Sequence, residues 1–199
     1  MIIKKNKLML FFFILIFFFN HQTLTKADDI RDLKIDGISI GDSLLDFFSK
    51  NEIEKTFVYK SNEYYLFTTD KYGGPTYDGI QFHAKTNDER YIIAALEGLK
   101  LFDGNFNECL SLKKKITNEL STVFKNTNKF DDSGDHSYDP SGESKYYRTN
   151  FAVDPASEYI NVSVTCYDWS PTLEKRFADK LSVAISNNEF NYFTNNSAY

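Results

Sequence analysis

The two cysteines constrain the fold most, because each one lies on the apolar face of a different predicted element. Cys109 falls within 106–124, where apolar residues recur at three- and four-residue steps and predict a helix. Cys166 falls within 158–168, where aliphatic side chains alternate with polar ones and predict a strand with one buried face. We therefore expect this helix to pack against this strand.

An even pair of cysteines in an exported protein most simply forms one disulfide, here Cys109–Cys166. Closing a loop of nearly sixty residues would stabilise the fold by roughly 4 kcal/mol in the chain-entropy model. The alternative is a catalytic thiol, which needs an activating base. His83 and His136 are the only histidines after residue 27, and neither lies in a motif typical of cysteine enzymes. The pattern favours the disulfide.

Residues 1–27 have the three parts of a secretory signal peptide. A start with three lysines precedes an unbroken apolar run over 8–19, and small residues lead to a cleavage point between Ala27 and Asp28. The apolar run is shorter than the roughly 20 residues that a membrane-spanning helix needs, so cleavage is favoured over retention as an anchor. We expect an exported protein, periplasmic or secreted.

Charge argues against several partners. Cleavage would change the formal net charge from −5 to −9, since residues 1–27 hold four lysines and no acidic residues. A protein that binds the phosphate backbone of nucleic acids needs a basic face, so no nucleic-acid partner is expected. Contact with a membrane is expected only through an uncleaved N-terminal segment. No cofactor-binding motif is present, which leaves a protein or a small molecule as the partner.

The pattern over 28–199 predicts a single α+β domain. We expect an antiparallel sheet of six or seven strands, packed against the long helix over 106–124 and one or two short helices, the first over 43–50. Hairpins are predicted where alternating runs flank turn residues, at 56–68, 78–99 and 146–168, with a last strand near 181–185. Residues 126–145 are rich in Asn, Asp, Ser and Gly and are expected to form a long polar loop.

The polar loop contains the clearest candidate metal ligands. Asp131, Asp132, Asp135 and Asp139 could supply carboxylate oxygens to Ca²⁺. Their spacing does not align with the EF-hand pattern, which needs ligands at alternating positions, glycine sixth and glutamate twelfth. A solvated acidic loop is the favoured interpretation, with a calcium site as the alternative.

One motif suggests an enzyme. The run Gly41-Asp42-Ser43-Leu44 resembles the signature of the GDSL family of serine esterases and lipases, which implies that Ser43 would be a nucleophile with a base and an oxyanion hole. The family's Gly-x-Asn-Asp cue is matched only by Asn87-Asp88, and its Asp-x-x-His cue fails at His136, where Ser133 stands in place of aspartate. We interpret Asp42 or Ser43 as a helix cap and keep the esterase as an alternative.

Two longer stretches carry a second resemblance. Residues 38–48 and 166–170 resemble a group of small exported proteins of AT-rich marine alphaproteobacteria. The resemblance implies a periplasmic location and no particular activity.

The sequence therefore predicts a non-catalytic binding or interaction module. The alternatives are the Ser43 esterase and an envelope structural protein held by a retained N-terminal helix. The aromatic residues most suited to line a pocket are Tyr77, His83, Tyr146 and Trp169. Asn161 and Asn195 each begin an N-glycosylation pattern, and the sequence leaves open whether either is used.

Overall fold

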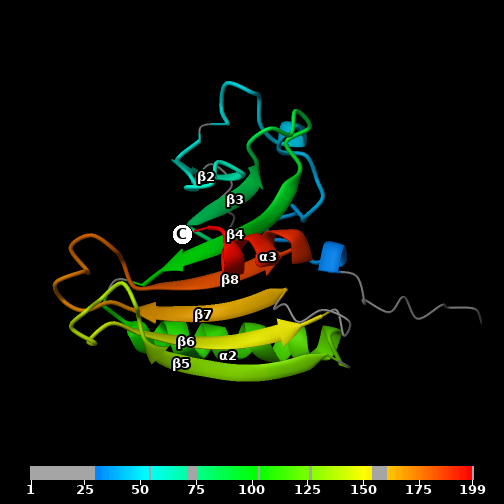
Figure 1. Cartoon of the computed structure of the whole chain (residues 1–199). Helices are drawn as coiled ribbons and strands as arrows, with labels where there is room; N and C mark the ends of the chain where they lie inside the picture. The colour runs from blue at the N-terminus through cyan, green and yellow to red at the C-terminus, as the bar shows by residue number, and fades with distance from the viewer. Residues whose placement is uncertain are drawn as a thin grey trace, which may run out of the picture.

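One open sheet of eight antiparallel strands organises the chain (Figure 1). The computed structural model describes residues 30–53, 55–70, 76–102, 104–125, 127–153 and 161–198, so the predicted signal segment and its cleavage point lie outside the described residues. The strands are β1 (Phe57–Val58), β2 (Tyr64–Thr69), β3 (Gly79–Lys85), β4 (Ile93–Leu101), β5 (Asn128–Asp135), β6 (Lys145–Ala152), β7 (Val162–Asp168) and β8 (Lys180–Ser186). Their order in the sheet is β1-β2-β3-β4-β8-β7-β6-β5.

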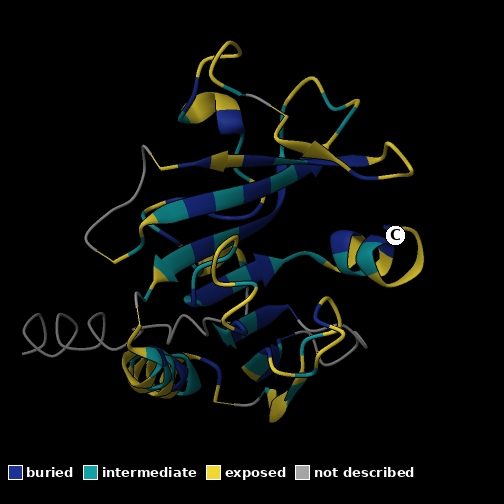
Figure 2. Cartoon of the chain, turned by 90° about the vertical axis from the view of Figure 1, so that its left-hand side faces the viewer, coloured by how far each residue is buried: buried dark blue, intermediate teal, exposed yellow. Residues whose placement is uncertain are grey.

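Two four-stranded meanders build the sheet, and a helix follows each. Strands β1 to β4 run in sequence from one edge to the middle, and α2 (Phe106–Val123) then carries the chain to the far edge. Strands β5 to β8 return to the middle, where β8 pairs with β4, and α3 (Asn188–Asn196) ends the described chain. The helices lie on opposite faces of the sheet (Figure 2).

The main core lies on the α2 face. Helix α2 covers β7 and β8, and the Cys109–Cys166 disulfide joins α2 to β7 with the two Cα atoms 6.0 Å apart. Residues 30–53, which include the short 3₁₀ turns η1 (Ile30–Asp32) and η2 (Leu44–Asp46), bring further apolar side chains to the same core. Leu44 and Phe82, for example, are fully buried there. The predicted disulfide is confirmed.

The α+β expectation is wrong: the protein is a mainly-β fold, because two sequence segments adopt other structures than predicted. Residues 126–145 contain strand β5 and the start of β6 rather than one long loop. Strand β5 is an edge strand that pairs only with β6 and exposes most of its side chains, so its backbone hydrogen bonds need no apolar alternation. The predicted helix over 43–50 contains only the single 3₁₀ turn η2.

Other differences are local. The turn expected around Asp154-Pro155 lies outside the described residues. Residues 171–176 form a series of turns, whereas residues 188–196 form the nine-residue helix α3. Within the described ranges, neither helix combines the length and the apolar character that crossing a bilayer requires.

Candidate functional site

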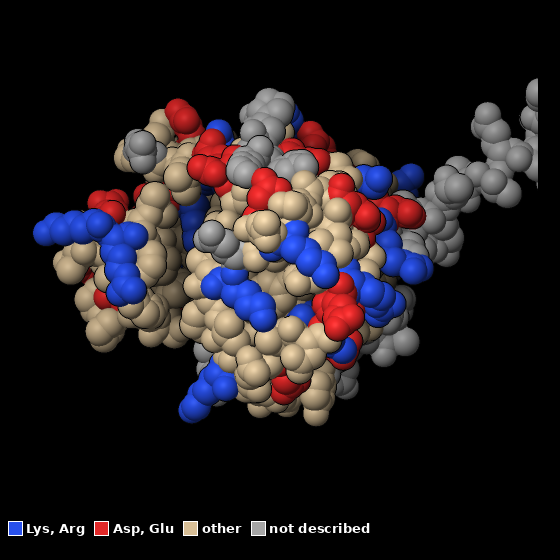
Figure 3. Space-filling view, turned by 90° about the horizontal axis from the view of Figure 1, so that it is seen from above, with Lys and Arg blue, Asp and Glu red and all other residues tan. Residues whose placement is uncertain are grey.

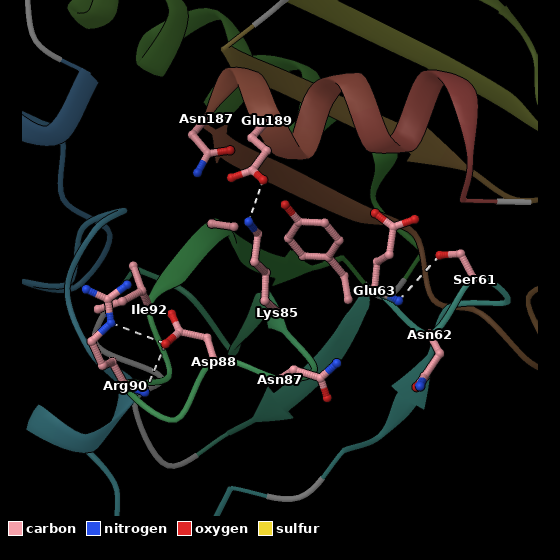
Figure 4. Close-up of a pocket in the computed structure, with 12 residues that line it drawn as sticks. Ser61, Asn62, Glu63, Lys85, Asn87, Asp88, Arg90, Ile92, Asn187 and Glu189 are labelled. Atoms are coloured by element: carbon pink, nitrogen blue, oxygen red, sulfur yellow. Dashed lines mark hydrogen bonds and ion pairs between the residues drawn. The ribbon is translucent and has the colours of Figure 1, made fainter.

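A groove of about 700 Å³ opens where the β3–β4 turn meets the start of β2 and the start of α3 (Figure 4). We call it the turn groove; its lining comes from segments 61–64 and 85–94 and from Asn187 and Glu189. Its volume falls within the range of about 300–1,000 Å³ that is usual for small-molecule sites.

A β-bulge in β4 positions the start of helix α3 beside this groove. The pairing of β3 with β4 shifts between His83 and Ala84, which leaves Ala94 as an extra residue in β4. The backbone N–H of Asn187 donates to the carbonyl of Ala94 at 3.0 Å, and the Asn187 side-chain oxygen accepts from the backbone N–H of Phe190 at 2.8 Å. Asn187 therefore caps α3 and ties its first turn to the bulge.

Aromatic contacts hold Tyr64 rigidly beneath the groove. Its ring centroid lies 5.2 Å from that of Phe190 and 4.6 Å from that of Phe193, and only 1% of the residue is exposed. The Tyr64 hydroxyl nevertheless has no hydrogen-bond partner among the described residues. Burial, together with the negative charges of Glu189 and Glu63, raises the pKa of Tyr64 to about 12. The phenol is therefore a neutral donor and acceptor at all physiological pH values.

Most of the charged side chains in the groove are already paired. Lys85 forms an ion pair with Glu189 of α3, and Arg90 Nε lies 3.3 Å from Asp88 Oδ1 (Figure 4). Burial of Asp88 opposes ionisation, but hydrogen bonds from Arg90 outweigh it and lower the pKa of the Asp88 carboxyl. These two pairs account for four of the five charged side chains in the lining, and Glu63 is the fifth.

Amide and hydroxyl groups make up the rest of the polar lining. Asn62 and Asn87 come from the turns that flank the groove, and Ser61 and Asn187 add a hydroxyl and a third amide. Amides and hydroxyls both donate and accept hydrogen bonds. Ile92 and Ala94 add apolar surface. Viewed from above, cationic and anionic side chains are intermixed across the body of the molecule (Figure 3).

Ser43 has the structural role of a cap. Its Oγ accepts from the backbone N–H of Leu45 at 3.1 Å and donates to the carbonyl of Arg90 at 2.6 Å. Neither described histidine pairs with it: His83 Nδ1 is hydrogen-bonded to the Tyr59 hydroxyl at 3.1 Å, and the His136 ring lies against Trp169. Within the described residues, no histidine base is hydrogen-bonded to Ser43.

The four aspartates of the calcium alternative are not gathered into one cluster. Asp131 accepts from Thr149, Asp132 accepts from Tyr146 at 3.1 Å, and Asp135 pairs with Lys145. Asp139 accepts from Ser141 and Ser144, which hold the pKa of its carboxyl well below the usual range. In the part of the chain that the structure describes, no group of three or more His, Cys, Asp or Glu side chains could hold a metal ion.

The four residues that the sequence predicts to line a pocket lie in different parts of the structure. His83 lies beneath α3, with its ring 4.6 Å from that of Phe190. Tyr77 packs against the main core, Trp169 is buried beside His136 and Phe177, and the Tyr146 ring lies 5.0 Å from the Arg148 guanidinium. None of them lines the turn groove.

The two glycosylation patterns also differ. Asn161 is 3% exposed and its side-chain nitrogen donates to Asn188 at 2.7 Å, so an N-linked glycan there would break a buried hydrogen bond. Asn195 is exposed on α3.

The sequence did not single out Tyr64, Lys85 or Glu189. They become neighbours only because α3 returns to the β2–β3 hairpin, and Lys85 and Glu189 lie 104 residues apart. Comparison of the chain with protein-family models, with curated proteins and with solved structures finds no match.

Proposed function

We propose that this protein is an exported binding module that holds a small, neutral, hydroxyl-rich ligand, a saccharide, in the turn groove. Export is supported by the signal-like pattern of residues 1–27 and by the resemblance to exported proteins of marine alphaproteobacteria. It is further supported by the Cys109–Cys166 disulfide, because disulfides persist in oxidising compartments and are rare in reducing ones.

The Tyr64 hydroxyl is the observation that carries the binding proposal. A buried hydroxyl with no partner costs about 1–3 kcal/mol relative to a satisfied one. Tyr64 cannot turn away to find another partner, because Phe190 and Phe193 pack against its ring. A ligand hydroxyl in the groove would supply the missing hydrogen bond.

The ligand class follows from which groups remain available. Lys85 pairs with Glu189 and Arg90 pairs with Asp88, so an anionic ligand would compete with a carboxylate that is already paired and would also meet the Glu63 carboxylate. The amides and hydroxyls match sugar hydroxyls, which also donate and accept. Ile92 and the other apolar lining can contact the C–H face of a sugar ring.

The test is saturation-transfer NMR with the mature protein and four neutral disaccharides: maltose, cellobiose, laminaribiose and chitobiose. We expect at least one disaccharide to show saturation transfer that Tyr64→Phe reduces at least fivefold, the effect of losing one hydrogen bond of about 1 kcal/mol. Tyr192→Phe is the matched control, because Tyr192 lies on α3, is 58% exposed and does not line the groove.

Two results would contradict the proposal. Absence of saturation transfer from all four disaccharides would exclude a neutral saccharide, and binding that is equal in Tyr64→Phe and Tyr192→Phe would show that the ligand does not contact the buried hydroxyl.

A further inference from the structure

A second groove lies on the sheet face that carries α3, between α3 and strands β4, β8, β7 and β6. We call it the sheet-face groove; its volume is about 340 Å³. The strand register places four of its lining residues, Glu97, Ala184, Ser163 and Asn150, in one row across the sheet, and Arg148 in the next row, opposite Thr165. It differs from the turn groove in its lining and in the charges that it presents.

Arg148 is held in position but retains free hydrogen-bond donors. Its Nε donates to Thr165 Oγ1 at 3.3 Å, and its guanidinium lies 5.0 Å from the centre of the Tyr146 ring. No carboxylate of the described chain lies within 4.0 Å of this guanidinium. A half-buried guanidinium with free N–H groups is suited to bidentate binding of a carboxylate.

Asn150 provides the complementary acceptor. The residue is 1% exposed, lines the groove, and its side-chain oxygen has no hydrogen-bond partner among the described residues. Glu97 adds a negative charge on the same row and accepts from the Ser182 hydroxyl. On the α3 side of the groove, the buried side-chain nitrogen of Asn191 also has no partner in the described part of the chain.

We propose that the sheet-face groove binds a free α-amino acid as its zwitterion. The carboxylate would pair with Arg148 and the ammonium would donate to Asn150. Arg148 and Asn150 are two residues apart on β6 and therefore lie on the same face of the sheet, where one small ligand in the groove can contact both. Phe190 and Ala184 offer apolar contact for the ligand side chain.

The charge pattern favours a zwitterion over a simple anion. A simple anion would satisfy Arg148 but would leave the Asn150 oxygen unpaired. A simple cation could donate to Asn150 but would be repelled by Arg148. Only a ligand that carries both an anionic group and a cationic donor matches both residues.

The experiment measures the Tm of the mature protein with each of the twenty L-α-amino acids at about 10 mM. We expect at least one to raise Tm by about 3 °C, as follows when its concentration is about ten times Kd. Its counterpart without the amino group, its counterpart without the carboxylate, and inorganic phosphate should each leave Tm unchanged. Arg148→Gln should abolish the shift, and Arg176→Gln, at an exposed arginine outside the groove, should retain it.

The proposal is overturned if no amino acid raises Tm, if the acid without its amino group or phosphate raises Tm equally, or if Arg148→Gln keeps the full shift. Should Arg148→Gln fail to fold, Asn150→Ala replaces it, and an unchanged shift in that variant would have the same meaning. Tyr64→Phe should leave the amino-acid response intact, so this result is independent of the turn groove.

Discussion

Lowering the pH is expected to destabilise the protein through His83. The imidazole lies between Tyr59 and Phe190, with ring centroids 5.9 Å and 4.6 Å away, and Nδ1 is hydrogen-bonded to the Tyr59 hydroxyl at 3.1 Å. Burial lowers the pKa of His83 to about 4. The folded protein therefore favours the neutral ring, whereas the unfolded chain takes up a proton near the ordinary pKa of about 6.5.

The direction and magnitude of this destabilisation follow from the linkage between protonation and unfolding. Between pH 6.5 and pH 4 the unfolded state binds more protons than the folded state, so the free energy of unfolding falls as the pH falls. For a pKa of about 6.5 unfolded and about 4 folded, the loss from pH 7 to pH 5 is at most about 2 kcal/mol. The His83 ring keeps partial contact with solvent, so we expect about 1 kcal/mol.

Urea denaturation at pH 7 and pH 5, followed by tryptophan fluorescence, measures this loss in the wild type and in His83→Gln. His83→Gln loses the packing of the imidazole ring at both pH values. Subtracting the variant's change in unfolding free energy between pH 7 and pH 5 from that of the wild type therefore isolates the contribution of His83 protonation. His136, whose pKa is also lowered by burial, is present in both proteins and cancels. Equal pH dependence in the two proteins, or a His83 NMR titration midpoint near pH 6.5, would refute the reasoning.

Three other outcomes are expected. Gly98→Ala should lower the free energy of unfolding by about 1–3 kcal/mol in urea denaturation, because a Cβ would lie 2.8 Å from Tyr77 and 2.9 Å from Ile35. Gly79→Ala is the control, because its Cβ would have its nearest contact at 3.5 Å, and a loss as large as that of Gly98→Ala would contradict the prediction. Replacing both disulfide cysteines with alanine should cost about 4 kcal/mol by urea denaturation, since they lie 57 positions apart in the sequence; a cost below about 1 kcal/mol would contradict the loop-entropy argument. Mass spectrometry of the exported protein should find Asp28 first, and a start at Met1 would exclude cleavage.

Alternation in the sequence predicted the strands that have one buried face. Strands β3 and β7 place residues such as Phe82 and Cys166 in the core at every second position, and both strands lie within the predicted runs. The Cys109–Cys166 disulfide could be predicted for the same reason, because each cysteine lies on the apolar side of its own element. Local periodicity suffices where burial sets the pattern.

Strand β5 could not be predicted in this way. Its residues are exposed on both faces, apart from the partly buried Gly134, so burial imposes no alternation and the composition resembles that of a loop. Its pairing with β6 is a property of the hairpin as a whole. The mainly-β class was missed for this reason, since a strand rich in Asp and Asn gives no apolar signal.

The candidate sites escaped prediction because both depend on α3. Phe190 and Phe193 seat this helix on Tyr59 and Tyr64, far away in the sequence, and its two sides then form walls of the turn groove and of the sheet-face groove. The helix has an apolar stripe of only two buried phenylalanines, which the sequence alone does not distinguish from a frayed C-terminal turn. A short helix, stabilised mainly by tertiary contacts, thus creates the concave polar surfaces that an otherwise open sheet face would lack.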